Sequence, residues 1–172
     1  MYESNNKPVN TAEKFKKEIA ELGGKECWGV VGGSGTGSVI NLKVEDRFLK
    51  KAPSKSSYLS DLVRNYDSEY DFMIYCPWRI ENDGEVICGS HHTNEDDGPY
   101  KRGFDQLIGE KIYNVSSSYP AFDLEISFGN GVILNASCVS IGMDDNICYS
   151  FRTPKGWFTI YFDGDIEFEQ HT

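Results

Sequence analysis

The sequence predicts an α+β fold made mostly of antiparallel β-meanders, with one helix at the N-terminal end. Three observations support this class. Apolar residues recur at helical spacing near the start, apolar and polar residues alternate through much of the remainder, and glycine-containing turns separate the alternating runs. A chain of 172 residues suits a single domain spanning 1–172. Weakly similar patterns around Cys76 and Cys148 leave open a second organisation, in which β-rich halves 1–90 and 104–172 are joined by a loop at 91–103.

The first predicted element is a helix that begins at Asn10. Asn10 and Glu13 have the spacing of a capping box, and Gly23-Gly24 is a typical stop signal. The residues between them form an apolar stripe of Phe15, Ile19 and Leu22, and a charged outer face of Lys14, Lys16, Lys17, Glu18 and Glu21. A second, shorter helix is expected at 57–66.

Strand-like runs make up most of the chain after this helix, at 27–31, 38–44, 71–80, 85–88, 122–128, 132–138, 147–151, 157–162 and 166–168. The Asn130-Gly131 pair between two alternating runs is the strongest hairpin signal. The glycine-rich stretch 32–37 is interpreted as a hairpin loop, because it lacks the lysine and the following helix of a phosphate-binding loop. Segments 45–57 and 89–103 are expected to be exposed loops.

The charge of the chain narrows the class of partner. There are 17 Lys and Arg against 27 Asp and Glu, which gives a formal net charge of −10. An acidic excess of this size repels nucleic-acid phosphates, so the sequence predicts no direct nucleic-acid binding. It favours a basic protein partner, or solubility alone.

The hydropathy pattern and the cysteines indicate the cellular compartment in which the protein is expected, the cytoplasm. No apolar run approaches the ~20 residues of a membrane span, and the N-terminal residues do not resemble a signal peptide, so a cytoplasmic protein without membrane association is expected. The cysteines are Cys27, Cys76, Cys88, Cys138 and Cys148, an odd number without a C-x-x-C pair. They are predicted to be reduced, buried thiols that pack as small apolar side chains.

One cluster of potential ligands and nucleophiles supports an alternative function. Cys88, His91 and His92 lie close together in the sequence, followed by three acidic residues, and a metal- or thiol-dependent enzyme could use them. The cluster lies in a segment typical of an exposed loop and lacks a second, separated ligand pair. The sequence also contains no compact nucleophile motif. We therefore expect no metal, no cofactor and no catalytic residue.

The candidate partner-binding residues are acidic side chains expected on loops, together with one tyrosine. They are Asp67, Glu69, Asp71, Glu95, Asp96, Asp97, Asp144, Asp145 and Tyr100. Carboxylates interleaved with aromatic rings have the composition that a basic protein surface would bind well.

From about residue 57 to the end, the chain resembles a family of small bacterial proteins, several of them encoded beside toxin genes. The resemblance rests on the segments 62–66, 75–80, 86–90, 107–111, 122–131 and 149–154. The Leu-Ile-Gly-x-Lys run at 107–111 and the Phe128-Gly129-Asn130-Gly131 turn are also similar to immunity proteins of polymorphic toxin systems, including contact-dependent growth inhibition. These motifs build sheets, so they bear on fold more than on function.

The resemblance implies an immunity protein that binds and neutralises a cognate toxin domain, such as a basic nuclease, by occluding its active site. It brings no catalytic residues. Two alternatives stay open: the enzyme that would use Cys88, His91 and His92, and a structural or regulatory module without a toxin partner. The sequence does not indicate an oligomeric state.

Overall fold

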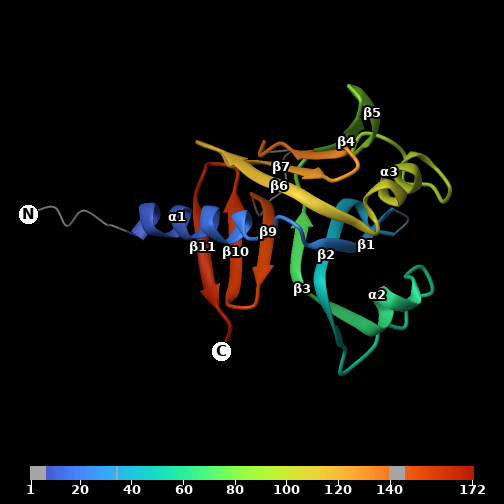
Figure 1. Cartoon of the computed structure of the whole chain (residues 1–172), viewed down its shortest axis with the longest axis horizontal. Helices are drawn as coiled ribbons and strands as arrows, with labels where there is room; N and C mark the ends of the chain where they lie inside the picture. The colour runs from blue at the N-terminus through green and yellow to red at the C-terminus, as the bar shows by residue number, and fades with distance from the viewer. Residues whose placement is uncertain (1–6, 34, 140–145) are drawn as a thin grey trace, which may run out of the picture.

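The computed structural model describes residues 7–33, 35–139 and 146–172 (Figure 1). Its helices are α1 (Lys7–Ala20), α2 (Asp61–Asn65) and α3 (Pro99–Leu107). Its strands are β1 (Glu26–Gly33), β2 (Gly37–Leu49), β3 (Tyr66–Ile74), β4 (Trp78–Asn82), β5 (Glu85–Gly89), β6 (Glu110–Ser118), β7 (Asp123–Phe128), β8 (Ile133–Ala136), β9 (Ile147–Thr153), β10 (Gly156–Tyr161) and β11 (Ile166–Gln170). The predicted class, α+β with antiparallel meanders and an N-terminal helix, is confirmed.

The strands form one antiparallel sheet in the order β11-β10-β9-β3-β2-β1-β6-β7-β8-β4-β5. The sheet has two parts, because β1 and β6 pair only at Glu26↔Lys111 and Cys27↔Glu110. Figure 1 shows β6 and β7 running across the ends of β9–β11 and α1 lying over β9–β11. The strand order places the C-terminal meander next to β3 and the β4–β5 hairpin next to β8.

This order corrects the alternative organisation into two successive halves. Strand β9 belongs to the second half of the sequence but pairs with β3 of the first half, from Asp71↔Arg152 to Ile74↔Tyr149. Conversely, β4 of the first half pairs with β8 of the second. Each part of the sheet therefore contains strands from both 1–90 and 104–172, because non-local pairing buries more apolar surface than either half could bury alone.

Helix α1 packs into the core through Phe15. The Phe15 ring is fully buried and lies 5.5–6.3 Å, centroid to centroid, from the rings of Phe122, Tyr149, Phe151 and Phe158. The predicted apolar stripe is confirmed, since Ile19 and Leu22 are also buried. The predicted start of the helix is wrong: α1 begins at Lys7, so Asn10 lies within it. Glu18 is also not on the outer face, because it is 4% exposed and paired with Lys155.

Several other boundaries differ from expectation. Strand β2 continues to Leu49 in the segment expected to be a loop, and the helix expected at 57–66 is only the short α2, capped by the Ser60 side chain. The segment 89–103 ends in a helix, α3, whose apolar side is formed by Tyr100, Phe104 and Leu107. Gly103 in the middle of this helix obscured the helical signal.

Strand β6 was not predicted, and its register explains why. A register shift between Ile112 and Asn114 places the buried residues Ile112 and Val115 an odd number of positions apart. Strict alternation is thereby lost, and period-two patterning cannot detect the strand. None of the helices in the described ranges is long and apolar enough to cross a membrane.

Candidate functional site

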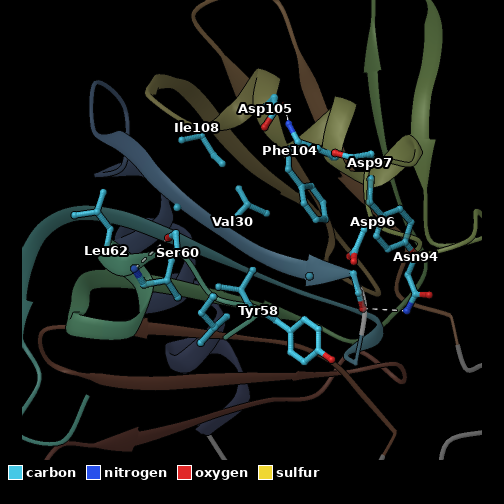
Figure 2. Close-up of a pocket in the computed structure, with 18 of the residues that line it drawn as sticks. Val30, Tyr58, Ser60, Leu62, Asn94, Asp96, Asp97, Phe104, Asp105 and Ile108 are labelled. Carbon is cyan, nitrogen blue, oxygen red and sulfur yellow. Dashed lines mark hydrogen bonds and ion pairs between the residues drawn. The ribbon is translucent and has the colours of Figure 1, made fainter. Parts of the chain in front are cut away.

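A cleft of about 590 Å³ lies between β1, α3, the segment that leads into α2, and the acidic loop 94–97. Figure 2 shows Val30 of β1 and Phe104 of α3 between two ends of different character. Leu62 and Ile108 lie at one end, and Asn94 and Asp96 at the other. The cleft therefore combines an apolar floor with an acidic end.

The apolar side chains at its rim are unusually accessible. Tyr58 is 78% exposed, Leu62 is 41% exposed and Ile108 is 44% exposed. They surround Phe104, which is only 7% exposed and forms part of the wall. Accessible apolar side chains gathered at a concave surface are typical of binding sites.

The acidic end contains most of the charge. Glu95, Asp96, Asp97 and Asp105 line the cleft and are all exposed, and Lys101 is the only basic side chain among the described residues of the lining. The Nζ of Lys101 lies 2.7 Å from Oδ2 of Asp105, and this hydrogen bond raises the pKa of the amine. The lining has a formal charge of −3, and the carboxylates of 95–97 have no ion pair of their own among the described residues.

The glycine-rich end of β1 allows the cleft to form. A Cβ atom at Gly32 would lie 2.8 Å from Cγ2 of Ile40 and 2.9 Å from Cζ of Phe104, so only glycine lets α3 lie this close to β1. The Asn94 side chain then connects the acidic loop to the hairpin, because its amide donates to the carbonyl oxygen of Gly33 at 2.9 Å. The stretch 32–37 joins β1 to β2, as the hairpin prediction expected.

The acidic loop leads directly into α3. Asp97 has a φ of 60°, and Gly98 and Pro99 follow it at the helix start. Glu95, Asp96 and Asp97 therefore lie immediately before the first turn of α3.

Among the predicted partner-binding residues, the structure brings together Glu95, Asp96, Asp97 and Tyr100 at this cleft. Tyr100 belongs to its wall rather than its accessible surface, since it is 3% exposed and its hydroxyl donates to the Ser90 carbonyl oxygen at 3.4 Å. Burial raises the pKa of this phenol. Sequence reasoning missed the apolar residues Val30, Tyr58, Leu62 and Ile108, which come from segments far apart in the chain.

The other predicted acids lie elsewhere. Asp67, Glu69 and Asp71 were expected on a loop but lie on β3. Asp71 is 3% exposed and pairs with Lys43 and Arg152, so its carboxylate is part of the protein interior and not a docking group. Asp67 and Glu69 are half-buried, with Asp67 4.0 Å from the Nζ of Lys50. Asp144 and Asp145 lie outside the described residues.

Cys88, His91 and His92 do not form a compact ligand set in the described ranges. The Cys88 thiol faces Gly103 of α3, and burial raises its pKa to about 11. His92 is engaged locally, because its Nδ1 accepts a hydrogen bond from the Gly89 amide at 3.1 Å. The thiol is therefore packed and protonated, unlike a typical activated nucleophile.

All five cysteines are buried and free of disulfide bonds in the structure, which confirms their predicted burial. The structure nevertheless brings three of them together. The sulfur atoms of Cys76, Cys138 and Cys148 lie within 4.8 Å of one another, which no spacing in the sequence indicates. A second group of potential ligands consists of the carboxylates of Glu45, Asp46 and Glu69 on β2 and β3.

The chain matches no protein-family model, no curated protein and no solved structure.

Proposed function

We propose that the chain is a cytoplasmic immunity protein that binds a cognate basic toxin domain, such as a nuclease, and occludes its active site. The observation that supports this best is the cleft between β1 and α3, in which accessible apolar side chains adjoin four carboxylates. A purely solvated acidic surface would not need the apolar rim, and a small-molecule site would not need so much exposed charge.

In the proposed mechanism, the two ends of the cleft bind different side chains of the toxin. A toxin that holds nucleic acid uses Lys and Arg side chains to bind phosphate. Glu95, Asp96 and Asp97 would accept charge-assisted hydrogen bonds from those side chains and so replace the phosphate. An apolar toxin residue between Leu62 and Ile108 would supply the desolvated contact that slows dissociation.

The area of the interface must exceed the cleft itself. A stable protein–protein interface buries about 800 Å² per partner, so the cleft would be its centre and the surrounding surface its rim. The net charge of −10 would accelerate encounter with a basic partner.

The test is co-expression with candidate basic toxin domains, taken first from the genes adjacent to the one that encodes this chain. We expect the chain to restore growth of cells that produce the toxin, and the two purified proteins to form a 1:1 complex by analytical ultracentrifugation. A variant with Glu95→Lys, Asp96→Lys and Asp97→Asn should lose protection. Asparagine is chosen at 97 because it tolerates the positive φ there.

A matched control carries Glu85→Lys, Glu125→Lys and Glu169→Gln, which produce the same change in net charge at exposed positions outside the cleft. The control should protect as well as the unmodified chain. If both variants lose protection equally, the acidic residues of the cleft act only through the net charge of the chain. Absence of any complex would overturn the proposed function.

A further inference from the structure

Three buried cysteines from separate parts of the chain meet where the two parts of the sheet adjoin. Cys76 lies between β3 and β4, Cys138 follows β8, and Cys148 is in β9. They are 3%, 4% and 2% exposed, and their sulfur atoms all lie within 4.8 Å of one another.

Backbone hydrogen bonds hold each cysteine in place. The amides of Tyr75 and Cys76 both donate to the carbonyl oxygen of Cys148, at 2.9 and 3.0 Å. The amide of Cys138 donates to Oδ1 of Asp123 at 2.6 Å. The three sulfur positions are therefore set by the β-sheet and its connections and not by flexible side chains alone.

The spacing of the sulfur atoms suits one metal ion. A metal–sulfur bond of about 2.3 Å places thiolates that share an ion roughly 3.8–4.0 Å apart, so shifts of less than about 1 Å would bring all three into contact with it. The nearby polar groups are already engaged: the Asp123 carboxylate accepts from Cys138, and the Tyr149 hydroxyl donates to the Phe122 carbonyl oxygen at 2.8 Å.

The number of ligands favours one kind of ion. Within the described ranges, no histidine, carboxylate or further cysteine joins the three at the same distance. Structural zinc sites are almost always four-coordinate and tetrahedral. Cu(I) is a soft, d¹⁰ ion that prefers thiolates and accepts three of them in a plane.

The other two cysteines provide an internal contrast. Cys27 and Cys88 are as deeply buried as the three clustered cysteines, but neither belongs to the group of mutually close sulfur atoms.

We propose that Cys76, Cys138 and Cys148 bind a single Cu(I) ion in a three-coordinate sulfur site. Each thiol that coordinates as a thiolate releases its proton to solvent, and no electron is transferred. Because the β3–β4 connection, the segment after β8 and strand β9 each contribute one cysteine, the bound ion would stabilise the junction between the two parts of the sheet. This proposal is independent of the proposed function.

The experiment is an anaerobic titration of the reduced, full chain with Cu(I) buffered by a competing chelator. We expect one ion per chain, a thiolate-to-copper charge-transfer absorption in the near ultraviolet, and a higher midpoint of thermal unfolding. Cys76→Ser and Cys148→Ser should each weaken Cu(I) binding by more than about 100-fold. A loss of this size exceeds that caused by removing a residue that only hydrogen-bonds to a metal ligand. Cys27→Ala and Cys88→Ala remove equally buried thiols outside the cluster and should leave the affinity unchanged.

X-ray absorption at the copper edge of the unmodified protein gives a second readout that does not depend on the folding of any variant. Three sulfur neighbours support the proposal, and a shell dominated by nitrogen or oxygen overturns it. Binding that survives in the cluster variants, or that is lost equally in the two controls, also overturns it. So does tighter binding of Zn(II) than of Cu(I) to the same cysteines in a parallel titration.

Discussion

The Nζ of Lys155 lies 2.6 Å from Oε1 of Glu18 and connects helix α1 to the turn between β9 and β10. The two ends of this ion pair differ in environment, since the side chain of Glu18 is 5% exposed and that of Lys155 is 60% exposed. The buried carboxylate thus has a partner that reaches it from solvent.

We expect Lys155→Met to destabilise the protein, because it leaves the Glu18 carboxylate buried without its partner. The hydrogen bond to Glu18 raises the pKa of Lys155 above its ordinary 10.5, so the pair's contribution is complete below that pH and is lost as pH rises through the raised value. The variant and the unmodified protein should therefore differ in free energy of unfolding by the same amount at neutral pH and at about pH 9, as measured by urea unfolding. If that difference in free energy decreases before pH 9, the prediction is wrong.

Phe15 should be the most costly single truncation in α1. Phe15→Ala would remove a fully buried ring that contacts four aromatic neighbours, at a cost of about 3–5 kcal/mol in the free energy of unfolding. Lys16→Ala, at an exposed position one residue on, should change it by less than about 0.5 kcal/mol. Similar losses for the two variants, measured by chemical denaturation, would mean that α1 is not part of the core.

Gly103 and Cys88 should be energetically coupled. A Cβ at Gly103 would meet the Cys88 sulfur at 2.3 Å, so Gly103→Ala forces α3 away from β5 and should cost about 1–3 kcal/mol. Removing the sulfur with Cys88→Ala should recover much of that loss in the double variant. Additive effects in a double-mutant cycle would show that the thiol does not occupy this contact.

Association with the cognate toxin should depend on salt through the acidic loop. At 0.15 M ionic strength the Debye length is about 8 Å, so the on-rate should fall markedly from low salt to that value. In the variant with Glu95→Lys, Asp96→Lys and Asp97→Asn, the on-rate should be lower and less dependent on salt. Surface plasmon resonance over a salt series measures both, and an unchanged slope in this variant would argue against steering by the loop.

The apolar rim should instead control dissociation. Leu62→Ala and Ile108→Ala should each raise the off-rate by roughly 5- to 30-fold, equivalent to about 1–2 kcal/mol of binding free energy. Val86→Ala is the matched control, because Val86 is 51% exposed but lies outside the cleft. An off-rate equally insensitive to all three changes would place the interface on another surface.

The local pattern of the sequence was sufficient to predict the fold class, the apolar stripe of α1 and most strands. Phe15, Ile19 and Leu22 could be read from helical spacing, and the β7–β8 hairpin from its Asn130-Gly131 turn. These features depend on neighbours within a few residues, which is the range over which periodicity and turn chemistry act. Strand β6 escaped because its register shift disrupts that local period.

The sites depended on long-range pairing and could not be read in the same way. Asp71 and Asp96 are both acids of one sequence, yet Lys43 and Arg152 enclose the first, whereas the second lies open at the cleft. Cys76 and Cys148 meet only because β3 pairs with β9, and Leu62 and Ile108 line one cleft only because α2 and α3 both lie beside β1. The sequence by itself determined which residues are acidic, apolar or thiol-bearing. The tertiary structure decided which of them face one another, because burial and proximity arise from contacts between segments that are distant along the chain.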